Sequence, residues 1–539
     1  MWTVLLHSSA WAGQLDGELA QGLALREAES GALLDWIDHH APDHADEATV
    51  VVVVEGSEIP DGDLLALAGE PGDYRSQLRV PWSALGDLAV APGVERVRIP
   101  RIARPQQGLD RGRVVTEGLP LLFGAGDWGE ARIRGQHERI AILDVGFAGY
   151  GRQLGRELPE SVQTDFANGF WDTYDHGVSV AEIVHDVAPD AELSLYQFLT
   201  DVEFEQAVER MIDDDPDVVN ASIGFDNIWA ADGESHLSQA VDRLVRKTGA
   251  VWVNAAGNEG MSYRHGPLTD IDSDGILELG GLEDIRLLSE DEQYIVLRWQ
   301  SSSWNLDFLL INEAGEICAE ANWPQPAQAP ALEVWGGADC VGPTRLRIVE
   351  GEPTISFGRH AEGASASLYA YYGLAEADRS PEGSLTVPAD ARGAIAVGAC
   401  DVGTGAAPDW SSRGPTEDGR VKPDLCAPFI ASTATAGAGA FIGTSAAAPL
   451  VTGLAALIID GEGLTDDPEA VREALQAAAQ DFGEPGQDTT FGWGAPQMGE
   501  APRRCGCAQT GGAAGGTLLA GILALLSRRR APRPKGHPA

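Results

Sequence analysis

The sequence predicts an α/β fold: a doubly wound, mostly parallel sheet, with an inserted β-sandwich and a small α/β domain at the N-terminal end. The first observation is that short apolar strands alternate with helical stretches from residue 138 onward, which is typical of a parallel sheet. The second is that this alternation stops after residue 260 and resumes near residue 393. We therefore predict four parts: an N-terminal domain (1–115), an α/β domain (116–500), the insert within it (261–384) and a C-terminal tail (501–539).

The N-terminal domain contains none of the reactive residue patterns described below. An apolar strand over 49–54, a helix near 82–88 and a second strand over 94–99 predict a small α/β unit. The basic, proline-containing stretch 101–113 is typical of a linker. On these features alone the unit is either a separate binding domain or a propeptide.

The α/β domain supplies the parallel sheet, and the insert supplies mainly strands. In the α/β domain, strands are expected at 139–143, 191–196, 217–222 and 250–254, and helices at 202–212 and 236–247. In the insert, strands are expected at 293–299, 306–311, 345–348 and 367–372. Sites in parallel sheets form beyond the carboxyl ends of the strands, so the residues that follow the strands are the candidates for function.

The charge balance is strongly acidic, with 82 Asp and Glu against 37 Lys and Arg and a formal net charge of -45. Such a surface repels polyanions, so we expect no nucleic-acid partner. Cysteine pairs are the other informative feature of the composition. Cys318 with Cys340, and Cys400 with Cys426, are candidate disulfides if the protein is exported, although their spacing does not settle the pairing.

Three segments place an acid, a histidine and a serine at the ends of predicted elements. Asp144 ends a buried strand, His176 opens an apolar helix, and Ser445 lies where a glycine turn meets a helix, with a helical run expected over 450–459. A serine hydroxyl needs an imidazole to remove its proton, and a buried carboxylate holds that imidazole in the right tautomer. Each residue alone has an ordinary structural role, but the three together favour nucleophilic serine catalysis.

A fourth segment contains Asn258, in a glycine turn after a buried strand, whose side-chain amide suits an oxyanion. Over about residues 117–500 the sequence resembles the subtilase family of serine peptidases. The segments that carry the resemblance are Asp144-Val145-Gly146, His176-Gly177, Ala255-Ala256-Gly257-Asn258 and Gly443-Thr444-Ser445-Ala446-Ala447-Ala448-Pro449, in the order acid, histidine, serine of that family.

The resemblance implies a subtilisin-like fold and a role for each residue. Asp144 would orient His176, His176 would act as general base and acid, Ser445 would attack the peptide bond to form an acyl-enzyme, and Asn258 would bind the oxyanion. The resemblance also implies substrate-binding residues. Ser222, Ile223 and Gly224 resemble the family's substrate-binding strand and would pair with the backbone of a protein or peptide substrate.

The family resemblance extends to the first 115 residues, which resemble its propeptide and imply a zymogen. The sequence departs from the family at Val145, where Thr or Ser is usual, and at Val178 and Ser179, where Thr and His are usual. We expect activity to survive the loss of the second histidine, no cofactor to be required for the chemistry, and the protein to be a monomer. The alternative is a catalytically inactive subtilase fold that serves as a surface binding or adhesion protein.

A group of acidic residues in the insert suggests a metal. Asp270, Asp272, Asp274, Ile276 and Glu278 fall at alternate positions around a turn glycine, and hard oxygen ligands at that spacing suit Ca²⁺. The bidentate glutamate usual at the twelfth position of such a loop is missing. A structural calcium site and a solvated acidic turn are therefore both open.

The two ends of the chain bear on localisation. Residues 1–12 fit either a weak signal peptide or a cytoplasmic start. The tail has Cys505 and Cys507, then an apolar segment over 517–526 and three arginines. It resembles the C-terminal sorting signals of myxobacterial surface proteins, and a single-span anchor is the alternative. We expect an extracellular or cell-surface protein, attached to the outer membrane, whose tail contacts the membrane or the sorting machinery.

Overall fold

The computed structural model describes most of the chain between residues 48 and 502. The described ranges are 48–56, 65–67, 74–105, 125–166, 174–288, 293–300, 304–322, 331–337, 342–351 and 364–502, with Cys340 and a few isolated positions between 15 and 46. The expected signal peptide over 1–12, and Cys505 and Cys507 in the tail, lie outside the described residues.

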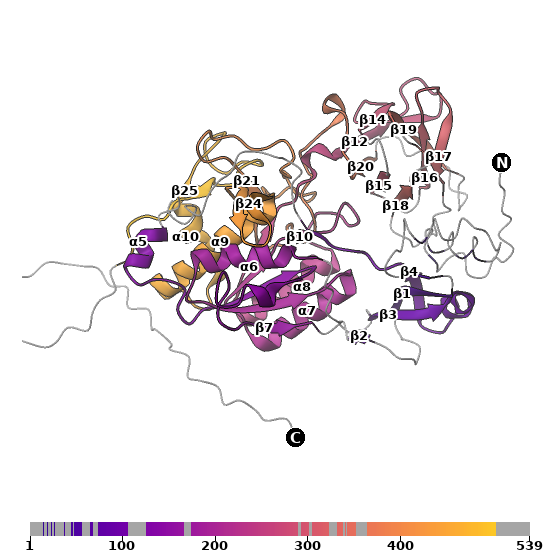
Figure 1. The fold of residues 1–539 in the computed structure, drawn as a ribbon. Helices are drawn as coiled ribbons and strands as arrows, with labels where there is room; N and C mark the ends of the chain where they lie inside the picture. The colour runs from indigo at the N-terminus through magenta and orange to yellow at the C-terminus, as the bar shows by residue number, and fades with distance from the viewer. Residues whose placement is uncertain are drawn as a thin grey trace, which may run out of the picture. The chain divides into compact units, whose positions relative to one another are not determined.

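A seven-stranded sheet forms the centre of the α/β domain, and all of its strand pairs are parallel (Figure 1). In spatial order the strands are β22 (Leu425–Ala427), β21 (Ala394–Ala399), β11 (Val251–Ala255), β9 (Val218–Ala221), β6 (Arg139–Asp144), β8 (Glu192–Gln197) and β7 (Gln163–Asp165). Side chains alternate between two cores along a strand. In β6, Ile140 and Ile142 join one core, whereas Ala141 and Leu143 join the other. Burial on both faces explains the continuous apolar runs.

Helices cover both faces of this sheet, which confirms the predicted doubly wound α/β class. The first core contains residues of α6 (His176–Val187), α9 (Thr444–Glu462) and α10 (Pro468–Ala477). The second contains residues of α7 (Asp201–Asp214) and α8 (His236–Thr248). A capping box at Thr200 starts α7, with Glu203 as its acidic partner.

Helix α9 begins at Thr444, earlier than the expected start at residue 450, and Pro449 lies inside it. Proline lacks the N–H that would bond the carbonyl four residues earlier, which belongs to Ser445. That carbonyl accepts a hydrogen bond of 3.2 Å from Ser222 Oγ instead, so the helix tolerates the proline. Among the described residues, α9 is the one helix long and apolar enough to span a membrane, and it is buried in the core of the domain.

The N-terminal domain is an antiparallel four-stranded sheet in the order β2-β3-β1-β4. Its elements are β1 (Thr49–Gly56), β2 (Leu65–Leu67), β3 (Tyr74–Pro81), the 3₁₀ turn η1 (Trp82–Ala84), α3 (Leu85–Ala89) and β4 (Val94–Arg98). The expected linker is more than a connection, because β5 (Arg104–Pro105) pairs antiparallel with β10 (Ile223–Gly224) of the α/β domain.

The insert is all-β, as expected, but its strands form one nine-stranded sheet and not two separate sheets, because β12 pairs with both β20 and β13. The strands of one half are β12 (Tyr263–Thr269), β20 (Ser365–Ala370), β15 (Gln293–Trp299) and β18 (Leu332–Gly337), and those of the other are β13 (Ile276–Leu279), β19 (Thr344–Glu350), β14 (Ile285–Leu287), β16 (Leu306–Ile311) and β17 (Ile317–Ala321). All their pairings are antiparallel, and both halves contribute to one core, for example Leu297 from the first and Phe308 from the second.

The remaining described elements are short, apart from one hairpin next to the start of α9. They are α5 (Ala125–Glu130), η2 (Tyr150–Arg152), η3 (Glu259–Met261), η4 (Glu376–Asp378), β25 (Ala479–Gln480), β26 (Ala495–Pro496) and the hairpin β23 (Ile430–Thr433) with β24 (Gly437–Ile442). Strand β24 leads directly into α9, so it fixes where that helix begins.

Candidate active site

Asp144 and His176 form a buried pair at the carboxyl end of β6. His176 Nδ1 lies 2.9 and 3.0 Å from the two carboxylate oxygens, and the residues are 0% and 5% exposed. Gly177 permits this approach, because a Cβ there would lie 2.8 Å from the Asp144 Cβ and 2.5 Å from the Phe147 ring. The backbone N–H of Val145 donates to Asp144 at 2.8 Å, so this carboxylate is hydrogen-bonded without the usual hydroxyl residue.

Ser445 is the second residue of α9, directly after a strained turn. Gly443, the residue before the helix, has a φ of 130°, which a residue with a side chain rarely adopts. Ser445 is 0% exposed, and its Oγ donates to the Ser222 carbonyl at 3.0 Å. The serine therefore lies against the expected substrate strand, at the N-terminus of a long helix whose first N–H groups have no helical partner.

His176 is the first residue of α6 and Ser445 the second of α9, and these two helices pack in one core. Phe441 on β24, four residues before the serine, has its ring centre 5.1 Å from that of His176. Among the described residues, His176 Nε2 has no hydrogen-bond partner. The serine hydroxyl is thus bonded to Ser222 rather than to the imidazole in this state.

Asn258 follows β11 and is joined to the residue before the serine. Its Oδ1 accepts hydrogen bonds from the Thr444 backbone N–H at 3.0 Å and from the Thr444 hydroxyl at 3.1 Å. The Gly257 N–H donates to the same hydroxyl at 3.3 Å. These bonds fix the plane of the Asn258 carboxamide next to the start of α9, so its nitrogen faces away from Thr444.

The expected substrate strand is already paired in this structure. Ile223 lies opposite Pro105 and Gly224 opposite Arg104, both in β5. On the other side of the same segment, Ala103 N–H donates to the Leu199 carbonyl at 2.9 Å. A short piece of the N-terminal region therefore lies as a third strand between two segments of the α/β domain.

Charged contacts hold the N-terminal domain at the start of α7. Arg98 lies 2.5 Å from Asp201, both are buried, and Glu55 lies 2.9 Å from the same arginine. Although burial opposes its ionisation, the positive charges of Arg98 and Arg96 lower the pKa of Glu55 to about 2. These carboxylates therefore remain charged in ordinary buffers. Bonds from Arg75 to Glu205 add a second, less buried contact.

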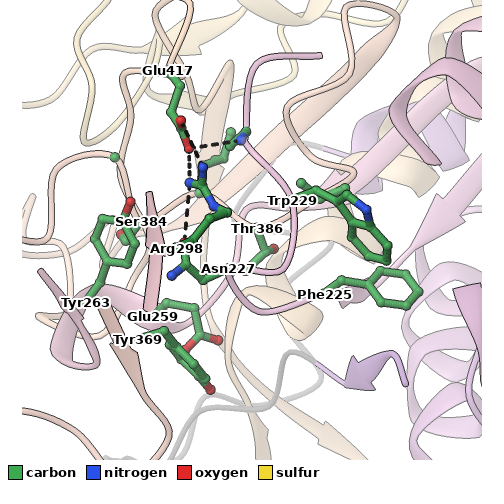
Figure 2. Close-up of a pocket in the computed structure, with 14 residues that line it drawn as sticks. Phe225, Asn227, Trp229, Glu259, Tyr263, Arg298, Tyr369, Ser384, Thr386 and Glu417 are labelled. Carbon is green, nitrogen blue, oxygen red and sulfur yellow. Dashed lines mark hydrogen bonds and ion pairs between the residues drawn. The ribbon is translucent and has the colours of Figure 1, made fainter. Parts of the chain in front are cut away.

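A pocket between the α/β domain and the insert was not predicted from the sequence. Figure 2 shows this pocket, with Phe225 and Trp229 from the segment after β10 on one side and Glu259 and the insert residue Tyr369 on the other. Arg298 of β15 forms an ion pair with Glu417 across it. The insert therefore contributes side chains to the surroundings of the substrate strand.

The structure brings together three of the five expected calcium ligands. The carboxylate oxygens of Asp270, Asp272 and Asp274 lie within 4.8 Å of one another, and Asp270 Oδ1 is buried with no hydrogen-bond partner among the described residues. Glu278 bonds to Thr269 Oγ1 and Ile271 N instead, at 3.2 Å each, and the Ile276 N–H donates to Asp274. The cluster suits a small hard cation, with Glu278 outside it.

Both candidate cysteine pairs are joined in the structure. Cys318 is bonded to Cys340 within the insert, and Cys400 to Cys426 at the ends of the neighbouring strands β21 and β22. Two buried or partly buried disulfides are typical of proteins from oxidising compartments.

The subtilase family model matches residues 166–278 and 373–494, on either side of most of the insert, and identifies the α/β domain as a serine protease domain of the subtilase family. Asp144 precedes the matched residues. No curated protein matches the sequence.

Solved structures are similar in fold. The CspB protease of Clostridium perfringens is 18% identical with a TM-score of 0.53, and the match covers 70% of this chain and 97% of that one. The epidermin leader peptide processing serine protease of Staphylococcus aureus is 14% identical with a TM-score of 0.46, and the match covers 84% of this chain and 98% of that one.

Proposed function

We propose that the protein is an exported serine endopeptidase, made as a zymogen, that hydrolyses peptide bonds of protein or peptide substrates through an acyl-enzyme. The observation that carries the proposal is the buried Asp144–His176 pair, in which His176 opens a helix that packs against α9, the helix that carries Ser445 at its start. An imidazole oriented by a buried carboxylate is the group that a serine nucleophile needs.

The reaction begins when Ser445 exchanges its bond to the Ser222 carbonyl for one to His176 Nε2. The imidazole takes the hydroxyl proton while Oγ attacks the substrate carbonyl, and Asp144 stabilises the imidazolium that forms. The proton then passes to the leaving amine, which leaves an acyl-enzyme. Water, deprotonated by the same imidazole, releases the acid and restores the serine.

Charge that develops on the carbonyl oxygen is stabilised at the start of α9. Thr444 holds the oxygen end of the Asn258 carboxamide, so its nitrogen is oriented to donate to that oxyanion. Loss of one such donor typically costs about 3 kcal/mol of transition-state stabilisation, or roughly a hundredfold in kcat. We therefore expect Asn258→Ala to lower kcat much more than it changes KM.

The zymogen proposal rests on the occupied substrate strand. Arg104 and Pro105 pair with Gly224 and Ile223, as an incoming substrate would. A substrate that pairs with Ile223 as Pro105 does would present its next residue to Ser222, and in the sequence Gln106 follows Pro105. We expect self-cleavage after Gln106, which would free the strand for other substrates.

The experiment compares the purified full chain with its Ser445→Ala variant. The wild type should label with a fluorophosphonate, lose its N-terminal region and yield a new terminus at Gln107, whereas the variant should do none of these. His176→Ala, which keeps the serine, should also fail to label. Identical chain lengths and no labelling of the wild type would reject the enzyme and leave the inactive surface binding protein as the better explanation.

Export and metal binding are separate proposals. The two disulfides support an extracellular or cell-surface location, and mass analysis of the native protein would show whether residues after Cys507 are removed. The cluster of Asp270, Asp272 and Asp274 supports a structural Ca²⁺, whose contribution would be to hold the β12–β13 turn.

A further inference from the structure

Arg104 places its side chain in a site made by two domains. Its Nε lies 3.2 Å from Asp226 Oδ2, two residues after Gly224 in the α/β domain. Its guanidinium carbon lies 4.7 Å from the ring centre of Tyr294 and 4.3 Å from that of Tyr371, both in the insert. An ion pair and two aromatic faces are the contacts that arginine makes best.

The acidic wall of this site is buried and hydrogen-bonded to the insert. Asp226 is 5% exposed, and Tyr369 Oη donates to its Oδ2 at 3.2 Å. Asp226 Oδ1 is buried and has no hydrogen-bond partner among the described residues. Arg104 and Tyr369 both contact Oδ2, so one oxygen of this buried carboxylate holds the guanidinium, while Oδ1 stays without a partner in the described part of the chain even with the arginine in place.

Two acidic groups lie close together at this site. Burial raises the pKa of Asp226, and burial together with the charge of Asp226 raises that of Glu259, while the nearby Arg104 acts in the opposite direction on both. The arginine therefore favours the ionised form of the carboxylate with which it pairs, and a substrate arginine in the same place would have the same effect.

The position along the substrate strand fixes which residue would supply that cation. Arg104 pairs with Gly224, which makes it the third residue before the bond expected to be cut. We propose that Asp226, Tyr294 and Tyr371 form a substrate subsite that selects an arginine at this third position, with Arg104 as its first occupant. The inference rests on the proposed peptidase function for the numbering of the position, but the binding of arginine is testable without activity.

The first experiment reads binding in the uncut Ser445→Ala chain by hydrogen exchange. The Ala103 amide, bonded to the Leu199 carbonyl, should exchange at least about tenfold faster in Arg104→Gln and in Asp226→Asn. Arg79→Gln is the matched control, since that arginine also has an acidic neighbour in the N-terminal domain but lies on the surface. Unchanged exchange at Ala103 in both test variants would overturn the site, and amides of α9 report whether each variant is folded.

The second experiment reads selectivity in the self-processed enzyme. Quenched peptides based on residues 103–108 would carry arginine or its neutral isostere citrulline at the third position before the cut. We expect kcat/KM to favour arginine by at least about tenfold, and Asp226→Asn to bring the ratio close to one. Asp284→Asn, an ion-paired aspartate elsewhere in the insert, is the control and should keep the ratio.

The outcomes separate this inference from the proposed function. Equal cleavage of both peptides by the wild type overturns the subsite and leaves the peptidase intact. If neither peptide is cleaved and Ser445 does not label, the peptidase proposal fails, and the exchange of Ala103 alone decides whether the site binds arginine.

Discussion

Ser222 is expected to stabilise the protein by replacing a hydrogen bond that Pro449 cannot make. The Ser445 carbonyl lies four residues before the proline, so no helical N–H reaches it, and Ser222 Oγ donates to it instead at 3.2 Å. Ser222→Ala removes this donor and leaves a buried carbonyl unsatisfied. The same hydroxyl also accepts from Asn220 Nδ2 at 3.0 Å, so a second bond is lost.

The expected cost follows from those two bonds. An unsatisfied buried group costs about 1–3 kcal/mol, and in a domain of this size each kcal/mol corresponds to roughly 2–4 °C in Tm. We expect Ser222→Ala to lower Tm by about 3–8 °C. The measurement belongs in the Ser445→Ala background, where self-digestion cannot remove the unfolded chain, with thermal and urea unfolding followed in parallel.

A double-mutant cycle with Pro449→Ala isolates the carbonyl. Alanine restores an N–H at position 449 that can bond the Ser445 carbonyl, so Ser222→Ala should then cost only the Asn220 bond. The coupling between the two substitutions should be about 1–2 kcal/mol. Additive effects, within about 0.5 kcal/mol, would refute the idea that the serine substitutes for the missing helical donor.

Three further predictions concern other parts of the molecule. Burial and the nearby Asp217 raise the pKa of Glu138 from 4.5 to about 8, so the folded chain keeps a proton that the unfolded chain loses. The free energy of unfolding should therefore fall as the pH rises from about 4.5 to 8. Glu138→Gln should remove this pH dependence and add about 1–3 kcal/mol of stability at pH 9, measured by urea unfolding. Arg98→Met leaves Asp201 buried without its main cation and should weaken docking of the N-terminal domain by about 3–5 kcal/mol. The measurement is the rate of proteolysis of that domain in the Ser445→Ala chain, which should rise. A further change of Asp201 to Leu should recover much of the loss. Excess EDTA should lower Tm in the wild type but not in Asp272→Ala, and an equal Tm with and without EDTA in the wild type would remove the calcium proposal.

Much of the α/β domain was predictable because its signals are local. Each parallel strand is a short apolar run, and each expected catalytic residue lies within two residues of a glycine that a turn or a close approach requires. The start of α9 was misplaced because Pro449 is typical of a helix boundary. What permits a helix around this proline is Ser222, more than two hundred residues away, which no local pattern reveals.

The strand within residues 101–105 was also not predicted, because its partners are distant in the sequence. Its prolines and arginines predict a linker, and nothing nearby in the sequence indicates a strand partner. The partner, β10, lies in another domain, and the tyrosines that hold Arg104 come from an insert that interrupts that domain. Strand β3 was not predicted either. Charged and polar residues such as Arg75 and Arg79 alternate along it, and most of its side chains are only partly buried, so it lacks an apolar run.

The place of the insert explains how it can contribute to substrate selection without disturbing the chemistry. Its first strand, β12, follows the turn that contains Asn258, and its last, β20, pairs with β12 so that Tyr263 lies opposite Tyr369. The chain therefore leaves and re-enters the α/β domain at adjacent points, and the parallel sheet is uninterrupted. Because β20 ends next to Asp226, the same arrangement brings Tyr369 into contact with the segment after the substrate strand. Changes in the insert should accordingly alter which peptides are cut, while changes at the ends of β6, α6 and α9 should alter how fast any peptide is cut.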